Sequence, residues 1–456
     1  MLKHNAPTTQ NANMDRRHYL KTCAAIGSAI VLPASALGKG GQLPPSERVN
    51  IAFVGAGGQG RVLLNQLIDQ CGQNNVAMVD VDENQARRSF DKYQGVPIFQ
   101  DFRRTLDQLD NQIDAVAIAT PDHMHFAPAM AAMQMGKHVF LEKPLTRTIW
   151  ETRQLVKAAT KYGVATQMGN YGHSMPGLYQ CREWIEAGTI GDVTEVHVWS
   201  SRGGGGSREW PLPEEPVPAT LNWNLWLGPA RERPYNSAYL PGRWRNFWDF
   251  GSGPLGDIGC HTLDAPMYAL QLGYPSVVRA EAKQATQHCV ARSSVVTYEF
   301  PRPGDEPPVT ITWYDGGNKP PRPEQLEPER ELAQEGGALF YGTKGVLYAM
   351  GMKPTSVRLL PESRMREFSE NLPAEKYGRI KEGHYMNWIN AVKGGPPACS
   401  HFGVAGFLTE VVNLGNLAIR TGKEIVWDGA ACKVTSAPAA NEFVKPYVRA
   451  GWEYSV

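Results

Sequence analysis

A glycine-rich loop between a strand-like and a helix-like segment constrains the fold of this chain more than any other feature. Residues 49–54 read Val-Asn-Ile-Ala-Phe-Val, an apolar run of strand length, and residues 55–60 read Gly-Ala-Gly-Gly-Gln-Gly. Residues 61–68 then show the apolar spacing of a helix that packs on a sheet. A Gly-x-Gly-x-x-Gly loop in this setting is typical of a βαβ unit that binds a dinucleotide.

The glycines of the loop have separate roles in that interpretation. Gly55 permits the tight turn after the strand, Gly57 lets backbone N–H groups approach a pyrophosphate, and Gly60 lets the helix lie close to the strand. The N-terminus of the helix adds partial positive charge near the phosphates. We therefore expect the loop, including Gln59, to bind the cofactor.

An acidic residue follows the next strand-like run, at the distance from the loop that a dinucleotide site requires. Residues 76–80 read Val-Ala-Met-Val-Asp, which places Asp80 about 20 residues after the loop. Its carboxylate would accept hydrogen bonds from ribose hydroxyls and repel a 2′-phosphate, which favours NAD over NADP. Asp82 is a second candidate for this role. Arg87 and Arg88 lie too far into the next helix to favour NADP, which nevertheless stays possible.

Three more strand-like runs continue the alternation of strands and helices, at residues 113–119, 138–141 and 164–169. In open α/β sheets, ligands bind outside the carboxyl ends of the strands. The loops at these ends therefore predict one shared crevice, formed by Thr120–His125, Glu142–Pro144 and Gly169–His173.

Six residues of these loops are predicted to contact the cofactor: Thr120, Pro121, His125, Glu142, Lys143 and Asn170. His125 could instead only brace its loop. His173 is a further candidate at the border of the site, and His384 is another, later in the chain.

After Gly188 the pattern changes to extended segments, which predicts a second domain rich in strands. The strand predictions are residues 194–199, 277–285, 293–300 and 309–314, followed by a hairpin over 337–348. Residues 316–335 are polar and predict a surface loop or an oligomer contact.

An irregular stretch from Arg202 to Pro254 follows the first strand of this series. It holds a dense set of rings: Trp210, Trp223, Trp226, Tyr235, Tyr239, Trp244 and Trp248. A structureless segment of this length is normally functional or disordered, and the rings argue against disorder. We expect it to wall a substrate pocket, with Arg243 and Arg245 available for hydroxyl or carboxylate groups. The alternative is that most rings pack the segment onto its domain.

Composition excludes several classes of partner. The chain has 46 Lys and Arg against 45 Asp and Glu, so nothing indicates nucleic acid or a polybasic membrane contact. The 7 cysteines are scattered without a metal-ligand spacing, so we expect no metal site and mostly buried free thiols. A disulfide among the later cysteines stays open.

The N-terminus resembles a twin-arginine export signal. Arg16 and Arg17 precede a weakly apolar run, and Ala34-Ser35-Ala36 fits a signal-peptidase site. We predict a signal peptide over residues 1–36 and a linker over 37–48; the alternative is an amphipathic helix of the mature fold. The run is too short to span a bilayer permanently, so we expect no membrane span in the mature protein. Export to the periplasm or medium would require the cofactor to stay bound and be recycled in place.

The ordered motifs together resemble the Gfo/Idh/MocA family, which includes glucose–fructose oxidoreductase and inositol dehydrogenase. They are Gly55–Gly60, Ala119–His125, Glu142–Pro144, Gly188–Val193 and Gly256–His261. The resemblance implies an α/β fold: a Rossmann domain at residues 49–170 and a C-terminal α/β domain at 171–456. The second domain would carry a large open, mostly antiparallel sheet that mediates contacts in a homo-oligomer, either a dimer or a tetramer.

The resemblance also implies a catalytic set of Lys143, Asp257 and His261. Asp257 and His261 are four residues apart, so on a helix their side chains would project from one face. His261 would take the hydroxyl proton, Asp257 would orient it or contact a hydroxyl, and Lys143 would stabilise the alkoxide. Lys143 could share the acid–base role, and the sequence does not choose between the two. Without the family motif, Asp257 could be a helix cap and His261 an interior histidine.

These features predict an NAD(P)-dependent oxidoreductase that acts on a hydroxyl of a sugar, glycoside or polyol, with tightly bound, recycled cofactor. One alternative is an NAD-dependent glycosidase or lyase that works by transient oxidation, elimination and re-reduction. The Gly-rich run 202–206 lacks the histidine of such enzymes, which weighs against it. Another alternative is a non-catalytic sugar-binding protein, which retention of the catalytic set argues against. The particular sugar stays open.

Overall fold

The computed structural model describes residues 47–304 and 306–456, of which Val49–Val456 form one compact unit. The predicted signal peptide at residues 1–36 lies outside the described residues, as does the predicted linker apart from its last two residues. Both stay predictions.

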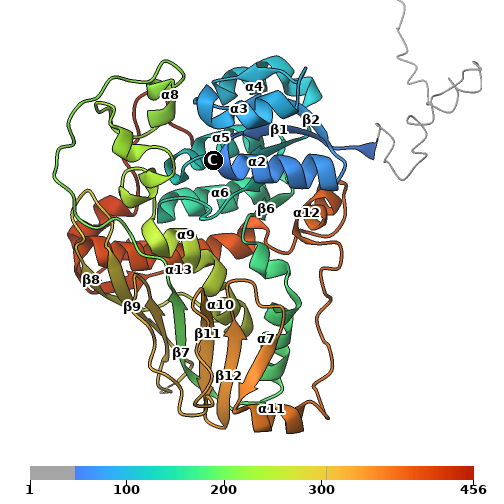
Figure 1. The fold of residues 1–456 in the computed structure, drawn as a ribbon, viewed down its shortest axis with the longest axis vertical. Helices are drawn as coiled ribbons and strands as arrows, with labels where there is room; N and C mark the ends of the chain where they lie inside the picture. The colour runs from blue at the N-terminus through green and yellow to red at the C-terminus, as the bar shows by residue number, and fades with distance from the viewer. Residues whose placement is uncertain (1–46, 305) are drawn as a thin grey trace, which may run out of the picture. The chain divides into compact units, whose positions relative to one another are not determined.

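Six parallel strands form the first sheet, in the order β3-β2-β1-β4-β5-β6. Figure 1 labels β1, β2 and β6 of this sheet. They are β1 (Asn50–Val54), β2 (Asn74–Val79), β3 (Ile98–Phe99), β4 (Ala115–Ile118), β5 (His138–Leu141) and β6 (Thr166–Met168). The sequence predicted all of them except the two-residue β3. The strand order reverses between β1 and β4, which is the switch point where doubly wound sheets bind ligands.

The helices that cover this sheet follow its strands in the chain. They are α2 (Gly58–Leu64), which continues as a π-helical turn over Asn65–Gln70, α3 (Glu83–Lys92), α4 (Phe102–Leu109), α5 (Phe126–Gln134) and α6 (Ile149–Tyr162). Helix α12 (His384–Val392), from much later in the chain, packs on the same sheet.

Alternate residues of β1 point to opposite faces of the first sheet, and both faces are buried. Ile51 and Phe53 pack in one apolar cluster with Trp388 of α12, whereas Ala52 and Val54 pack in another. Strands that are covered on both faces read as continuous apolar runs. This is why residues 49–54 predict a buried strand without an alternating pattern.

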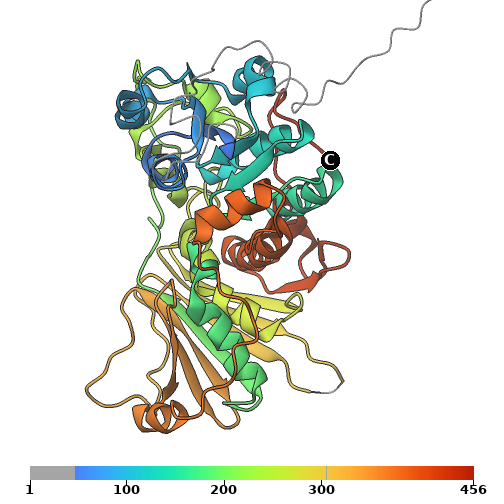
Figure 2. The same cartoon turned by 90° about the vertical axis from the view of Figure 1, so that its right-hand side faces the viewer.

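The second sheet has nine strands in the order β13-β12-β11-β7-β10-β9-β8-β14-β15. Figure 2 shows strands of this sheet in the lower part of the view. All neighbours are antiparallel except β7 and β10. The predicted strands correspond to β7 (Val193–Ser200), β8 (Val277–Lys283), β9 (Ser293–Phe300), β10 (Val309–Tyr314), β11 (Gly336–Gly342) and β12 (Gly345–Met350). Three short strands were not predicted: β13 (Val357–Leu360), β14 (Ile425–Asp428) and β15 (Lys433–Val434). The two sheets confirm the predicted fold class.

Helix α13 (Phe402–Thr421) joins the two sheets. It packs against α6 and β6 on one side and against β8 and β9 on the other, and Figure 1 shows it running between them. The helix is long and apolar enough to cross a membrane by length and composition, but 83% of its most apolar window is buried inside the protein. The burial of this helix in the protein core therefore explains its high hydropathy.

Further helices cover the second sheet on the side of α13. They are α7 (Pro176–Glu186), α9 (Gly253–Thr262) and α10 (Asp264–Leu270), with α11 (Glu362–Phe368) beside β13. On another apolar surface of this sheet, Leu326 packs with Trp199, whose Nε1 donates to the Ala333 carbonyl at 2.8 Å. The polar stretch 316–335 is therefore anchored to the sheet at these points.

The aromatic stretch 202–254 folds as a compact insertion with a short helix α8 (Trp223–Leu227). Its rings pack mainly on one another; Trp223, for example, stacks on Trp226 with centroids 4.8 Å apart. The insertion also pairs with the Rossmann domain, since the Asn222 N–H donates to the Val81 carbonyl at 2.8 Å. Most of these rings are core, as the alternative interpretation held.

The six cysteines among the described residues are free thiols: Cys71, Cys181, Cys260, Cys289, Cys399 and Cys432. Cys181, Cys260 and Cys289 are buried and the other three partly buried.

We predict that Gly60→Ala destabilises the protein by about 2–4 kcal/mol. A Cβ at residue 60 would lie 1.8 Å from the Gly55 carbonyl oxygen, so α2 would have to move away from the end of β1. The free energy of unfolding in urea measures the effect. Gly273→Ala is the control, because nothing lies within 4 Å of a Cβ there. Equal effects of the two substitutions would contradict the close helix–strand packing.

Candidate active site

A cavity of about 1040 Å³ lies at the carboxyl ends of β1, β2, β4, β5 and β6. The three loops that the sequence predicts to form one crevice all contribute to it, together with α9, the insertion and Trp452 near the C-terminus. Its volume is at the upper end of the range for ligand sites. It leaves room for a dinucleotide beside a small substrate.

The glycine loop forms one wall of this cavity and admits no side chain at its two critical turns. A Cβ at Gly55, where φ is +85°, would lie 2.6 Å from the Ala119 carbonyl oxygen. A Cβ at Gly57 would lie 2.8 Å from the Gln85 carbonyl oxygen. Gly55, Gly57 and Gln59 line the cavity, whereas Gly60 lies beneath the loop. The bare backbone facing the cavity fits a pyrophosphate.

Asp80 holds the glycine loop in place. Its Oδ2 accepts from the Ala56 N–H at 2.9 Å and the Gly57 N–H at 3.0 Å, and its Oδ1 accepts from the Asp82 N–H at 3.0 Å. Burial raises the pKa of Asp80 while these donors oppose the shift. Asp80 also lines the cavity, so a ribose contact would share this carboxylate with the loop.

The second acidic candidate for the ribose, Asp82, also lines the cavity. Its Oδ1 accepts from the N–H groups of Asn84 at 3.1 Å and Gln85 at 3.2 Å and so caps α3. Its Oδ2 takes no part in these bonds. The two acids therefore both face the place where a dinucleotide site holds the ribose.

The loop after β4 offers one unpartnered polar atom to a ligand. The Thr120 hydroxyl oxygen is buried without a hydrogen-bond partner among the described residues, and Thr120 and Pro121 both line the cavity. His125 has its Nδ1 2.8 Å from the Pro144 carbonyl oxygen and its Nε2 3.0 Å from the Thr120 carbonyl oxygen. Both of its ring nitrogens are thus engaged by backbone, which supports the bracing role.

Glu142 lies between the glycine loop and the end of β6. Its Oε1 accepts from Gln59 Nε2 at 2.9 Å, and burial raises its pKa. A Cβ at Gly169 would lie 2.6 Å from Glu142 Oε2, so a glycine is needed there. Glu142 is thus packed closely between Gln59 and Gly169, and it lines the cavity.

Lys143 and Asp257 form an ion pair that joins the Rossmann domain to α9. Lys143 Nζ donates to Asp257 Oδ1 at 2.7 Å and to the Asp257 carbonyl at 2.8 Å, and Arg245 Nε donates to the same Oδ1 at 3.2 Å. Burial opposes ionisation of Asp257, but the positive charges of Lys143 and Arg245 outweigh it and lower its pKa well below the usual range. Asp257 lies inside α9 after the cap at Ser252, which excludes the capping alternative.

His261 lies one turn after Asp257 on α9 and faces the cavity. Its Nδ1 is buried without a hydrogen-bond partner among the described residues. Burial and the nearby charge of Lys143 lower its pKa to about 3. His261 is therefore neutral at physiological pH, with a ring nitrogen free to accept a proton from a ligand hydroxyl.

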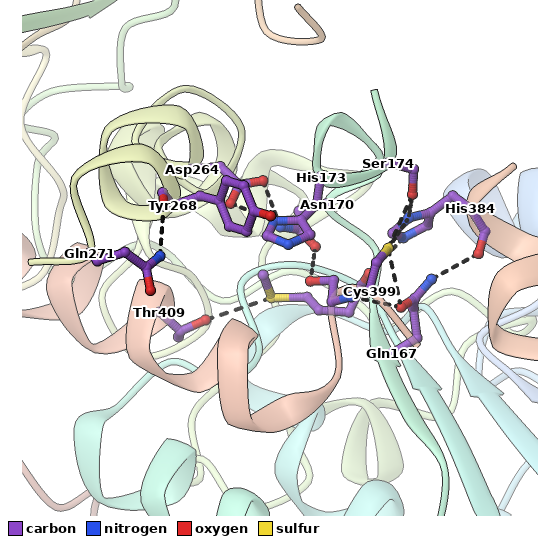
Figure 3. Close-up of polar contacts among 12 residues, drawn as sticks. Gln167, Asn170, His173, Ser174, Asp264, Tyr268, Gln271, His384, Cys399 and Thr409 are labelled. Carbon is purple, nitrogen blue, oxygen red and sulfur yellow. Dashed lines mark hydrogen bonds and ion pairs between the residues drawn. The ribbon is translucent and has the colours of Figure 1, made fainter. Parts of the chain in front are cut away.

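Asn170 and His173 do not line the cavity. They belong to a buried polar network (Figure 3). Asn170 Nδ2 donates to Asp264 Oδ2 at 3.0 Å, and His173 Nδ1 lies 2.8 Å from Asp264 Oδ1. Asn170 also accepts from the Ser400 hydroxyl. The predicted cofactor contact of Asn170 is therefore not supported. Its side-chain amide instead joins the end of β6 to Asp264 of α10 and to Ser400, just before α13.

His384 belongs to the neighbouring part of the same network. Its Nδ1 is 2.6 Å from the Ser174 hydroxyl oxygen and its Nε2 is 2.8 Å from the Met168 carbonyl oxygen (Figure 3). It is buried and does not line the cavity. Asn170 follows the end of a strand and His384 begins a helix, and ligand-binding residues occupy such positions as well. The sequence pattern therefore cannot distinguish these two residues from residues that contact a ligand.

Several cavity residues carry no sequence signal. They are Phe102, Lys353, Tyr385 and Trp452. Lys353 Nζ lies 4.8 Å from the centre of the Tyr171 ring. Of the arginines singled out in the insertion, Arg245 lines the cavity and Arg243 is exposed outside it, whereas Arg202 lines it unpredicted. Within residues 47–304 and 306–456, no cluster of three or more His, Cys, Asp or Glu could hold a metal ion.

The sheet order, the glycine cradle and the paired acids define a dinucleotide-binding protein of the Rossmann class. Comparison with family models agrees. The NAD-binding Rossmann fold of the Gfo/Idh/MocA oxidoreductases matches residues 49–170, and the C-terminal alpha/beta domain of the same family matches residues 182–303. The chain belongs to the Gfo/Idh/MocA oxidoreductase family.

Curated relatives match over part of their length. D-glucoside 3-dehydrogenase of Escherichia coli K12 is 26% identical over 52% of this chain and 58% of its own. The 2,7-anhydro-N-acetylneuraminate hydratase of Mediterraneibacter gnavus is 29% identical over 38% of this chain and 42% of its own. The chain thus spans somewhat over half of one of these relatives and less than half of the other.

A solved structure extends the likeness of fold to most of the chain. The WlbA dehydrogenase of Bordetella pertussis, in complex with NADH and UDP-GlcNAcA, superposes with a TM-score of 0.58 at 16% sequence identity. The match covers 84% of this chain and 99% of that one.

We predict that acid destabilises this protein through its buried histidines. His123, His261 and His384 have pKa values lowered to about 3 by burial, whereas in the unfolded chain they titrate near about 6.5. The unfolded state therefore binds more protons between these values, so stability is full above about pH 6.5 and falls as the pH decreases toward 3. Each histidine should cost on the order of 2 kcal/mol at about pH 5. Urea unfolding of wild type and His123→Gln at several pH values measures this; a flat profile from pH 7 to 5 would contradict it.

Proposed function

We propose that this protein is an NAD-dependent oxidoreductase that acts on a hydroxyl group of a sugar, glycoside or polyol. The observation that carries the proposal is the Lys143–Asp257–His261 arrangement at the end of a dinucleotide cavity. When bound, the nicotinamide supplies the acceptor for a hydride from the substrate carbon.

The side chains handle the proton that leaves the substrate hydroxyl. His261 is neutral and lines the cavity, so its imidazole can accept that proton. Lys143 already donates to both the carboxylate and the carbonyl of Asp257, and an ammonium offers no acceptor until it has lost a proton. This favours His261 as the base and Lys143 as the cation that stabilises the developing alkoxide.

Asp257 serves this chemistry by holding Lys143. Its carboxylate stays ionised because Lys143 and Arg245 both approach it. It also lies one helical turn from His261, so the base and the alkoxide-stabilising cation are set by one rigid helix.

Two peripheral segments support a firmly held cofactor. The insertion pairs with the backbone after β2, and the C-terminal residues cross the end of α4. Trp452 is 6% exposed, lines the cavity and packs beside Phe102, while Arg103 stacks on its ring at 4.4 Å. Arg449 fixes this tail by donating to the side chain of Asn224 in α8 at 2.8 Å. Both segments border the acids Asp80 and Asp82, where the adenosine half would lie.

A redox-neutral glycosidase or lyase is the second candidate. It would oxidise the sugar transiently, eliminate at the neighbouring carbon and return the hydride, so a retained cofactor suits it equally well. The hydratase among the relatives is consistent with chemistry of this kind, whereas Arg202–Gly206 lacks the histidine that such enzymes carry. A non-catalytic role is disfavoured, because the catalytic set is complete and polar.

We further propose twin-arginine export and a homo-oligomer. The export proposal depends on Arg16, Arg17 and the small-residue site at 34–36. The oligomer proposal is supported by two partly exposed rings on the second sheet, Tyr314 and Tyr341, which contact the buried ring of His197. A small-molecule carbohydrate is the proposed substrate.

The test of function is to incubate the purified protein with sugars, glycosides and polyols, with and without added NAD. We expect reduction of added NAD in proportion to substrate consumed. Lys143→Met should lower this turnover by at least about 100-fold while bound nucleotide is retained, whereas exposed Lys423→Met should leave it unchanged. Release of sugar over many turnovers without added NAD would instead support the redox-neutral candidate.

We predict that Trp452→Ala speeds dissociation of the nucleotide by about tenfold, because it opens one wall of the cavity. Bound nucleotide per chain after dialysis, followed over time, measures this. Tyr447→Ala is the matched control in the same tail, since Tyr447 is 48% exposed and does not line the cavity. Equal retention by wild type and both variants would refute a role of the tail in holding the cofactor.

A further inference from the structure

A second, smaller cavity lies outside the proposed active site and contains two arginines. It has a volume of about 40 Å³ and is bordered by Arg147 and the start of α6, by Trp248–Ser252 before α9, by Arg420 near the end of α13, and by Phe443. We call it the two-arginine cavity. It shares no lining residue with the active-site cavity.

Within residues 47–304 and 306–456, neither arginine has a carboxylate partner. Arg147 Nη1 donates to the Trp248 carbonyl at 2.8 Å, but its Nε is buried without a partner. The Arg420 guanidinium lies over the Phe443 ring at 4.0 Å, and its Nε is also buried without a partner. No ion pair within 4.0 Å links either of them to an acid in the described part of the chain. Both side chains are partly buried, and a guanidinium removed from water without a direct ion pair is costly.

The carboxylates around the cavity are engaged elsewhere or remain in solvent. Asp249 forms an ion pair with Arg233, and Glu151 accepts from the Thr148 hydroxyl at 2.7 Å. Glu442 is exposed. Burial and the charge of Arg147 lower the pKa of Arg420 to about 10, so it is still a cation at physiological pH. The cavity therefore holds an excess of positive charge.

Two further features favour a negative ligand with a water molecule beside it. Thr148 and Ile149, at the start of the 14-residue helix α6, line the cavity, so the positive end of that helix faces it. Asn413 is 5% exposed and its Oδ1 has no partner among the described residues, so this acceptor requires a proton donor such as water. The volume accommodates a small ion together with one water.

We propose that Arg147 and Arg420 bind a small inorganic anion of about the size of chloride in this cavity. The anion would link three segments near the active site: the chain just after Lys143, the residues that lead into α9, and α13, which packs against α9. Asn416 Nδ2 already donates to the Ser252 carbonyl at 2.9 Å, and Asn413 Nδ2 donates to the Thr146 carbonyl at 3.2 Å. Neutralising the arginines would stabilise this junction.

The first test is thermal unfolding of the full chain at constant ionic strength, with sodium chloride replacing sodium gluconate. We expect Tm to rise by about 1–3 °C between about 1 mM and about 200 mM chloride, because a ligand that binds the folded state stabilises it by mass action. Arg420→Met should abolish the dependence and Arg420→Lys should keep part of it. Arg279→Met is the control, since Arg279 is a surface arginine paired with Glu299 and Glu424.

The second test locates the ion directly and does not depend on a variant that folds. Crystals of wild type grown or soaked in bromide should show an anomalous peak within hydrogen-bonding distance of both guanidinium groups. A Tm that does not respond to chloride, or a cavity that holds only water in bromide, would overturn the proposal. A chloride response that persists in Arg420→Met would overturn it as well.

Discussion

The ion pair between Lys143 and Asp257 is the interaction on which the rest of the site depends. Lys143 comes from the loop after β5 of the Rossmann sheet, and Asp257 comes from a helix that packs against the second sheet. Both side chains are about 15% exposed, so the pair is largely removed from water. Loss of one partner would leave the other as an uncompensated buried charge. The pair thus ties the chemistry to the relative position of the two sheets.

Helix α13 gives that relative position its stability. It packs against α6 and β6 of the first sheet and against α9, β8 and β9 of the second. Most of its 20 residues are apolar or small, and most are buried. Close packing in such an interface resists movement. The glycine-loop half and the α9 half of the site would therefore keep a fixed position relative to each other, with the reacting carbon between them.

The sequence predicted the fold and the site correctly where the local pattern of residues agrees with the tertiary structure. The continuous apolar runs at β1, β2, β4 and β5 predicted a parallel sheet, and the glycine loop predicted the close contacts of Gly55, Gly57 and Gly60. The sequence did not predict cavity residues that come from segments far apart in the chain. Lys353 and Trp452 reach the cavity from a strand connection and from the C-terminal tail, and no spacing in the sequence announces this.

Asn170 illustrates a different limit. It follows β6, as a ligand-binding residue would, but the direction of its side chain is set by partners on α10 and before α13. A sequence pattern specifies the end of a strand and not which buried acceptor an amide will find. The same argument explains His384, whose two ring nitrogens are satisfied by Ser174 and by the Met168 backbone.

The contacts of Asp80 add a structural reason to expect NAD and not NADP as the cofactor. Three backbone N–H groups donate to its carboxylate, and these bonds favour the ionised form at the end of β2 although burial opposes it. The bonds hold the loop conformation and are formed within the protein itself. Asp82 places a second carboxylate beside it, with one oxygen outside its helix-capping bonds. A 2′-phosphate would have to approach both acids, whereas ribose hydroxyls can donate to them. The same bonds that shape the glycine loop therefore also favour the unphosphorylated cofactor.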